Sequence, residues 1–138
     1  MRVTSFKFAL LITLLTGCAS QPSLYEQLGR QQGIDAIVGR FIYNLESEPR
    51  VSRYFERTNL NRFYEKFGEH MCEMANGPCI YTGDSLLQVH NGMNITEQDF
   101  NLLVELLMDA MDQENVSQVT QNQLVKLLVP MRPDVIYQ

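Results

Sequence analysis

The sequence is short of the residues that carry catalysis by protein side chains alone, because its 138 residues include only two histidines and three cysteines. It contains no Ser-His-Asp spacing, no phosphate-binding glycine loop and no His-Glu-x-x-His motif. The cysteines do not have the spacing of zinc ligands. An enzyme that works without a cofactor would therefore have few candidate catalytic side chains in this sequence.

Basic residues are also scarce in this chain. The formal net charge is −5, and loss of Arg2 and Lys7 with an N-terminal signal would change it to −7. An acidic domain is not drawn to the phosphates of nucleic acids or to anionic lipid headgroups. We therefore expect no nucleic-acid partner, and any attachment to a membrane must have a source other than charge.

An apolar run near the N-terminus is too short to span a bilayer as a helix of the mature protein. It covers residues 8–15, follows a basic start and is typical of a secretory signal. The residues Leu15-Thr16-Gly17-Cys18 resemble the lipobox of bacterial lipoproteins, in which the cysteine receives lipid and becomes the new N-terminus. The alternative is an ordinary signal peptide, cleaved after a small residue.

The lipobox resemblance predicts a signal peptide over residues 1–17, cleaved before Cys18, and a lipidated linker over residues 18–22. Stable anchoring needs more than one acyl chain. Such a protein lies on the periplasmic side of the bacterial cell envelope and contacts the membrane through its lipid only. Since Ala19 is not an aspartate, the inner-membrane retention signal of some bacteria is absent, and we expect the outer membrane.

The rest of the chain has the spacing of helices, with no sustained alternation of period two and no internal repeat. Apolar residues at steps of three and four predict one helix that ends before Pro49 and another that stops at residues 76–78. A short helical turn is expected over 50–55 and an irregular segment over 75–83. The class is therefore all-α. The two apolar stripes are Ile34, Ile37, Val38, Phe41, Ile42 and Leu45, and Leu60, Phe63, Tyr64, Phe67, Met71 and Met74.

Three further helices are expected after the irregular segment. A brief one places Leu86 and His90 on the same side. Thr96 and Asp99 have the spacing of a capping box and open a long apolar helix. A last helix stops at Pro130.

Two of these segments could enclose a flat apolar molecule. Phe63, Phe67 and His70 share one helix face, and Leu86 and His90 lie together on another helix. A porphyrin needs an apolar slot, an aromatic wall and one imidazole directed at its iron. The alternative is a core in which the aromatic residues only fill space and each histidine is hydrogen-bonded and inert.

Short fragments along the chain carry a family resemblance. They are Ser23 to Gly29, Phe41, Tyr54-Phe55, Gly77-Pro78, Tyr81-Thr82-Gly83, His90, Gly92, Ile95-Thr96, Phe100 and Arg132-Pro133-Asp134. In order and spacing they resemble the group I truncated hemoglobins over the whole predicted domain, residues 23–138. The resemblance implies a shortened globin, a two-over-two helical sandwich around heme, with a long loop before the heme-ligating histidine.

The resemblance also implies roles for individual residues. His90 would be the proximal ligand of the iron in heme b, iron protoporphyrin IX, and its other ring nitrogen would bond the carbonyl of Leu86 one turn earlier. Phe55 takes the place of the family's heme-stacking phenylalanine. The remaining heme-contact positions would be Ile42, Phe63, Phe67, Leu86 and Phe100.

The distal side departs from the family pattern. Many members carry a tyrosine just after the phenylalanine that corresponds to Phe41, but here that position is Ile42. Tyr43 follows one helix step of about 100° later and should face away from the pocket. Phe63 and Phe67 occupy the family's distal polar positions. Since the usual donors to dioxygen are missing, we expect the pocket to favour carbon monoxide or nitric oxide.

Two polar residues could still supply a second, distal iron ligand. Lys66 falls where some relatives place an iron-ligating side chain, and His70 is the only other histidine. The alternatives are that Lys66 pairs with a heme propionate or is solvated, and that His70 is buried and hydrogen-bonded at the far end of the pocket. We prefer these alternatives.

The function that the resemblance implies is reversible binding of a diatomic gas (oxygen, nitric oxide or carbon monoxide) by a membrane-tethered carrier, scavenger or sensor. Nitric oxide dioxygenation, known for some relatives, would need bound dioxygen and a reductase partner. One alternative is heme transfer or electron relay with a second endogenous iron ligand. Another is a heme-free interaction module that keeps only the globin fold.

Two cysteines, Cys72 and Cys79, remain after removal of the signal. An exported protein meets an oxidising compartment, where these two cysteines can form a disulfide. Residues 76–78 allow the tight reversal that such a bond requires. The alternative is a pair of free thiols.

Overall fold

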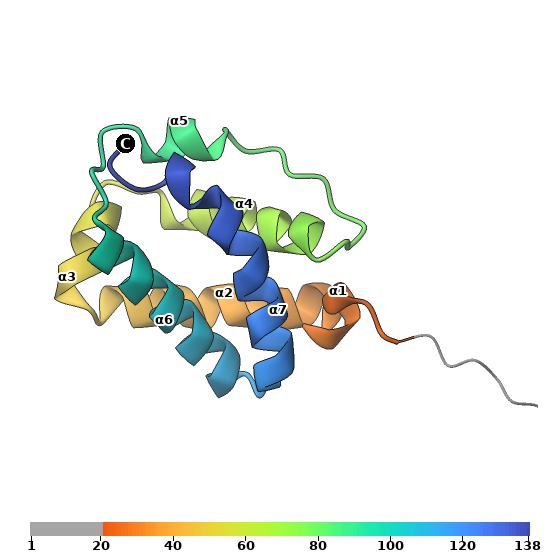
Figure 1. Cartoon of the computed structure of the whole chain (residues 1–138). Coiled ribbons are helices and arrows are strands. Elements are labelled where there is room, and N and C mark those ends of the chain that lie inside the picture. The colour runs from red at the N-terminus through yellow and green to blue at the C-terminus, as the bar shows by residue number, and fades with distance from the viewer. Residues whose placement is uncertain (1–20) are drawn as a thin grey trace, which may run out of the picture.

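The computed structural model describes residues 21–138, and these form seven α-helices and two 3₁₀ helices (Figure 1). The predicted signal peptide and Cys18 lie outside the described residues, as do the first residues of the predicted linker. The elements are α1 (Leu24–Gln27), α2 (Arg30–Glu46), α3 (Pro49–Ser52), η1 (Arg53–Phe55), α4 (Leu60–Met74), α5 (Leu86–His90), α6 (Glu97–Gln113), α7 (Gln118–Leu128) and η2 (Val129–Asp134).

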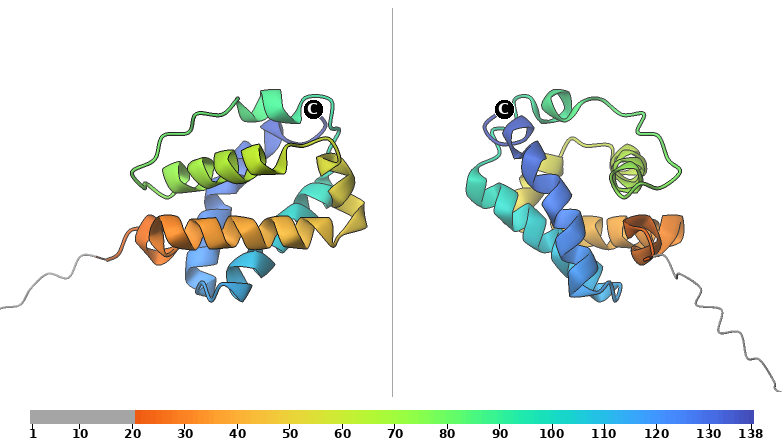
Figure 2. Two further views of the ribbon diagram at one scale, coloured as in Figure 1. Left: turned by 180° about the vertical axis from the view of Figure 1, so that it is seen from behind. Right: turned by 45° about the vertical axis from the view of Figure 1, so that its right-hand side comes forward.

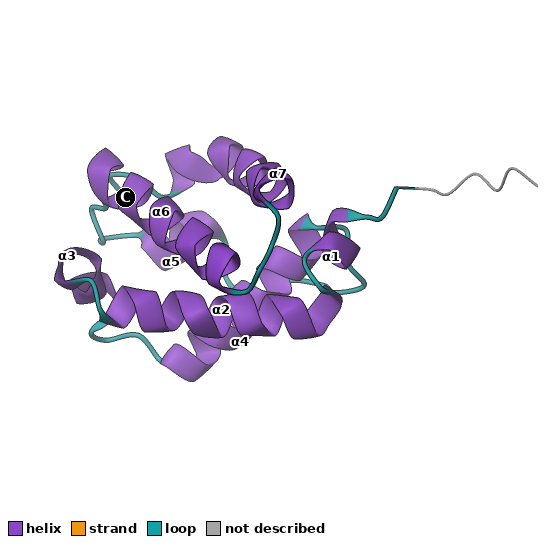
Figure 3. Ribbon diagram, turned by 90° about the horizontal axis from the view of Figure 1, so that it is seen from below, coloured by secondary structure: helices purple, strands orange, loops and turns teal. Residues whose placement is uncertain are grey.

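The long helices form two crossed layers. α4 lies along α2, and α6 and α7 cross in front of this pair in Figure 1 and behind it in the first view of Figure 2. Seen from below, α6 and α7 lie on one side of α2 (Figure 3). This arrangement is the two-over-two sandwich that the sequence predicts, and the all-α class is confirmed for residues 21–138.

The core lies where α2 meets the other long helices. Ile34, Ile37 and Val38 are fully buried, and Phe41 and Leu45 are nearly so. These residues recur at steps of three and four along α2, so one face of the helix is removed from water. Met71, Met111 and Leu124 meet this face from the other layers. The predicted stripe on α2 therefore forms the centre of the molecule.

Polar side chains set the starts of the helices. The side chains of Asn59, Thr96 and Ser117 each accept a hydrogen bond from a backbone N–H in the first turn of α4, α6 and α7. In α5, Ser85 and Gln88 form a complete capping box. A helix of only five residues needs such a cap, because it makes few internal hydrogen bonds.

Several boundaries differ from those expected. The helical turn after Pro49 divides into α3 and the 3₁₀ helix η1. The chain does not become irregular at Pro130, since η2 continues from Val129 to Asp134 with Pro130 near its start, where a missing N–H costs little. The end of the chain then pairs with the segment before α6 through a bridge between Ile95 and Ile136. This packing brings the C-terminus close to α5 (Figure 1).

Candidate functional site

His90 is held in one orientation by the short helix α5. Its Nδ1 lies 2.7 Å from the carbonyl oxygen of Leu86. Because a carbonyl oxygen only accepts, Nδ1 carries the proton and Nε2 of the neutral ring keeps its lone pair. Burial lowers the pKa of His90, against a smaller raising effect of the bond to Leu86, so the ring is neutral at pH 7. The nitrogen that can bind a metal is therefore Nε2.

A cavity of about 320 Å³ lies between α4, α5, α6 and the C-terminal η2, and His90 is part of its wall. Its size is that of a pocket for a small organic ligand. The structure brings together at this cavity most of the residues that the sequence singles out: Phe55, Phe63, Lys66, Phe67, His70, Leu86, His90 and Phe100.

Four phenylalanines form a continuous aromatic wall. The rings of Phe63 and Phe67 are stacked with centroids 5.4 Å apart, and Phe41 lies 5.4 Å from Phe67. Phe55 extends the wall in an edge-on arrangement, with its ring centroid 5.1 Å from that of Phe63. Phe63 and Phe67 remain half-buried, since they face the cavity rather than the core. Such a wall can cover one side of a flat apolar ring.

Ile42 does not line this cavity, in contrast to the prediction. It faces a second, smaller cavity shared with Leu45, Phe55 and Leu60. The reason is the helical rotation of about 100° per residue, which directs Phe41 into the main cavity and Ile42 away from it. Tyr43 is rotated further and is 62% exposed, so it does not contribute a hydroxyl to the site.

Lys66 is neither solvated nor free to reach the centre of the cavity. Its Nζ donates to Glu65 Oε1 at 2.7 Å, to Glu69 Oε1 at 2.9 Å and to Thr82 Oγ1 at 2.7 Å. Only 16% of the side chain is exposed. These hydrogen bonds use all three protons of the ammonium group. The expectation of a solvated amine is wrong, because the loop after α4 brings Thr82 to Lys66.

His70 lines the same cavity but lacks the hydrogen bond that was expected for it. Both ring nitrogens are buried, and within residues 21–138 neither has a hydrogen-bond partner. The ring contacts that of Tyr81, with centroids 5.0 Å apart. Burial lowers the pKa of His70, against a smaller opposing effect of Glu73. His70 is therefore a neutral ring with an unused donor and an unused acceptor.

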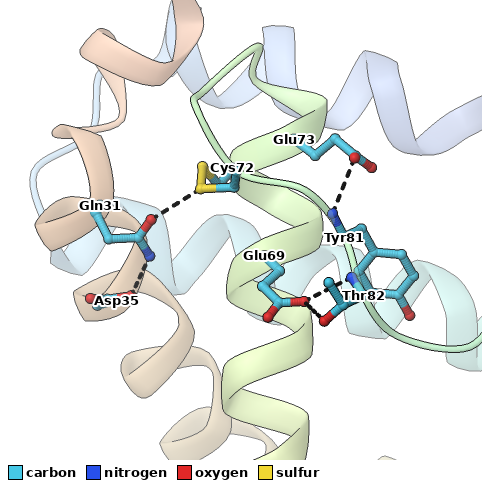
Figure 4. Close-up of a disulfide and its surroundings, with 8 residues drawn as sticks. Gln31, Asp35, Glu69, Cys72, Glu73, Tyr81 and Thr82 are labelled. Atoms are coloured by element: carbon cyan, nitrogen blue, oxygen red, sulfur yellow. Dashed lines mark hydrogen bonds between the residues drawn. A yellow bond between two sulfur atoms is a disulfide. The ribbon is translucent and has the colours of Figure 1, made fainter.

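The loop between α4 and α5 is fastened to α4 at several points (Figure 4). A disulfide joins Cys72 to Cys79, with Cα atoms 5.8 Å apart. Further along the loop, the Tyr81 N–H donates to Glu73 at 3.1 Å, and both the N–H and the hydroxyl of Thr82 donate to Glu69 at 2.9 Å. The loop thus forms a wall of the cavity and leads directly into α5.

Several cavity residues were not assigned a role from the sequence. Arg62, Tyr81 and Asp84 form part of its polar edge, and Met131 and Val135 close it from the C-terminal side. The steps of four from Arg62 through Lys66 could have revealed a polar stripe on α4. Met131 and Val135 were missed, because the last predicted helix ended at Pro130 and no helical spacing placed the residues after it.

A buried carboxylate of α6 joins this helix to α3 and η1. Asp99, 2% exposed, accepts from Tyr54 Oη at 2.7 Å, Arg50 Nε at 2.8 Å and Arg53 Nη2 at 3.2 Å. Its backbone N–H donates to Thr96, but its carboxylate does not return the bond, so the predicted capping box is only half formed. Burial would raise the pKa of Asp99, but hydrogen bonds led by that from Tyr54 lower it to about 2.

We expect Asp99→Asn to lower the free energy of unfolding by about 2 kcal/mol at pH 7, because charge-assisted hydrogen bonds are lost. Since the folded pKa is about 2 and the ordinary value is 3.8, the stabilisation is present above pH 4 and disappears as the pH falls toward 2. Urea unfolding at several pH values measures this. The control is Asp109→Asn, an exposed carboxylate of α6 with no ion pair in the described structure. Equal effects of both substitutions at pH 7 would contradict the prediction.

The described helices include none that is both long and apolar enough to cross a membrane. Residues 21–138 also hold no group of three or more His, Cys, Asp or Glu side chains placed to bind a metal ion.

Comparisons with known proteins agree with this geometry. A model of the bacterial-like globin family matches residues 23–137. The group 1 truncated hemoglobin of Mycolicibacterium paratuberculosis is 29% identical over 117 residues, which is 85% of this chain and 86% of that protein. The truncated hemoglobin of Tetrahymena pyriformis in its Fe(III) form superposes with a TM-score of 0.81 at 23% identity, covering 85% of this chain and all of that one. A 2/2 hemoglobin of Synechococcus with covalently attached heme gives 0.77 at 26% identity, covering 83% and 98%.

Proposed function

Because the chain belongs to the bacterial-like globin family, we propose that its main cavity binds heme b and that iron held there by His90 takes up a diatomic gas. The observation that carries the proposal is the hydrogen bond from His90 Nδ1 to Leu86 in the wall of an apolar cavity. It leaves Nε2 as the one nitrogen of this ring able to bind iron. The heme of the Synechococcus 2/2 hemoglobin supports heme binding by this chain.

The residues of the cavity fit such a group. The four phenylalanines cover a flat ring, while Leu86, Val89 and Phe100 supply apolar contacts near His90. Arg62 and Lys66 place positive charge at the edge of the cavity, and both are paired with acidic side chains of the chain itself. The two unpartnered nitrogens of His70 are explained if a ligand with polar groups completes the site. When bound, heme supplies the reversible binding of the gas.

The protein's own contribution is to hold the iron from one side and keep the other side dry. The bond to Leu86 fixes the ring of His90 and makes its free nitrogen more basic. The aromatic wall excludes water, and Phe41, Phe63 and Phe67 place no donor there. Dioxygen needs a donor to retain it firmly, whereas nitric oxide and carbon monoxide do not. We therefore propose a scavenger or sensor of nitric oxide or carbon monoxide that releases dioxygen quickly.

Titration of the heme-free protein with hemin tests this function. We expect a saturable one-to-one complex with a sharp Soret band, and a ferrous form that binds carbon monoxide. The control is the same titration in urea, which removes the cavity. A protein that remains colourless after hemin addition would contradict the proposal and favour an interaction module that keeps only the globin fold.

We further propose that the protein is exported and anchored by lipid at Cys18 on the periplasmic side of the outer membrane. The lipobox-like segment Leu15-Thr16-Gly17-Cys18 supports this proposal. The disulfide between Cys72 and Cys79 supports it independently, since such bonds persist mainly in oxidising compartments.

Cys18→Ser removes the site of lipid attachment, so we expect the protein to move from the membrane fraction to the soluble fraction of a bacterial lysate. Intact mass measurement of the unsubstituted protein should show the added acyl chains. Because the substitution lies outside the globin domain, heme content should be unchanged. Recovery of the unsubstituted protein in the soluble fraction, without lipid mass, would contradict the anchor.

A further inference from the structure

His70 is an unsatisfied polar group in an otherwise well-satisfied site. Of all buried side-chain nitrogen and oxygen atoms in residues 21–138, only three lack a hydrogen-bond partner, and two of them are the ring nitrogens of His70. The third is Nε of Arg132, which does not line the cavity. An unsatisfied buried polar group is costly, so it is rarely left without a partner that the site is built to receive.

No neighbour within the described structure forms a hydrogen bond with this ring. Tyr81 presents its ring to His70 while its hydroxyl donates to the carbonyl of Asp84 at 2.6 Å. Glu73, the acid whose charge His70 senses, accepts the N–H of Tyr81. Lys66 has all its protons engaged. The cavity that His70 lines is where a bound ligand can supply the missing partner.

The place of His70 on α4 indicates which part of that molecule it meets. Arg62, Lys66 and His70 follow one another at steps of four and form a polar stripe along the helix. Phe63 and Phe67 form the aromatic stripe beside it. A ligand with an apolar ring and carboxylates on one edge matches both stripes.

Charge on the polar stripe is distributed unevenly. Arg62 is paired with Asp84 at 3.2 Å, and Lys66 is paired with Glu65 and Glu69. A carboxylate that approached either cation would compete with these acids. His70 forms no ion pair or hydrogen bond in the described structure, and its neutral ring has one N–H to donate, although the charge of Glu73 acts on it.

We propose that His70 donates a hydrogen bond from its ring to a propionate carboxylate of the heme and so selects a porphyrin that carries free acid groups. This inference rests on the proposed heme-binding function. It differs from iron ligation by His70, because the ring lies beside Tyr81 and the loop, outside the stacked aromatic wall of Phe41, Phe63 and Phe67.

The test compares hemin with its dimethyl ester, in which both carboxylates are blocked. Dissociation constants are measured for the unsubstituted protein, His70→Phe and His70→Gln. We expect the unsubstituted protein to prefer hemin, and His70→Phe to reduce that preference about tenfold, as expected for one charge-assisted hydrogen bond. His70→Gln retains an N–H donor and should restore most of the preference. Arg62→Met is the matched control and should change it less, since Arg62 already has an acidic partner.

Three results would overturn the proposal. One is an equal preference for hemin in the unsubstituted protein and His70→Phe. Another is a preference that disappears in Arg62→Met but persists in His70→Phe. The third is a six-coordinate, low-spin ferric spectrum that His70→Phe abolishes, which would make His70 an iron ligand.

Failure of the proposed heme-binding function would look different, because the unsubstituted protein would then bind neither hemin nor its ester. Circular dichroism of the variants separates loss of binding from loss of the fold.

Discussion

Replacement of His90 by alanine is expected to release heme at least about a hundredfold faster to an excess of apomyoglobin. Loss of residues that only orient a metal ligand already costs tenfold to a hundredfold in affinity, and loss of the ligand itself should cost more. The cavity otherwise offers hydrophobic contact and weak polar contacts, which do not hold iron. The measurement is the decay of the Soret band after mixing with the acceptor.

The control for this prediction is Asn91→Ala, a substitution of the exposed residue next to His90. It should leave the rate of heme release close to that of the unsubstituted protein. Circular dichroism of the heme-free proteins shows whether His90→Ala has kept its helices. A folded His90→Ala protein that retains heme as well as the control would show that another residue binds the iron.

Phe67→Gln is expected to slow the release of dioxygen from the ferrous protein about tenfold. Phe67 lies in the cavity wall between Phe41 and Phe63, so an amide at this position enters an otherwise apolar surface. One hydrogen bond to a polarised ligand accounts for an effect of this size. Carbon monoxide is less polarised, and its release should change much less. Flash photolysis with both gases measures the two rates.

Tyr64→Gln is the matched control, since it places the same amide on α4 at a residue outside the cavity. It should alter neither rate. If Phe67→Gln left dioxygen release unchanged while Tyr64→Gln slowed it, the wall formed by Phe63 and Phe67 would not be the surface that meets the gas.

Much of the fold follows from local patterns in the sequence. The buried stripe of α2, with Ile34 and Ile37 at its centre, is visible as apolar residues at helical spacing. The placement of His90 was also predictable, because a capped helix of five residues brings its ring to the carbonyl one turn earlier. In both cases the decisive contacts lie within one helix, where the spacing of residues determines the geometry.

Features that depend on long-range packing were not predictable. The carboxylate of Asp99 was expected to cap its own helix, but Arg50 and Tyr54 reach it from a segment more than forty residues away. Lys66 was expected to pair with a heme propionate or to be solvated, but the disulfide-bonded loop brings Thr82 to it. Helical periodicity contains no information on which residues of other elements a loop will contact.

The missing partner of His70 illustrates the same limit in another form. Its position beside the cavity follows from its spacing to Phe63 and Phe67. Whether its nitrogens are satisfied depends on the side chains of Tyr81 and Glu73, which the irregular segment after α4 positions. Only the assembled structure shows that neither forms a hydrogen bond with His70.

The bond between His90 and iron can be observed directly by resonance Raman spectroscopy of the ferrous, ligand-free protein. The chain has two histidines, so in the His70→Phe variant a ¹⁵N label on histidine marks position 90 alone. We expect a low-frequency iron–nitrogen stretching band that shifts to lower frequency with the label. A heme-loaded protein whose iron–ligand bands do not respond to the label would contradict the assignment of His90 as the iron ligand.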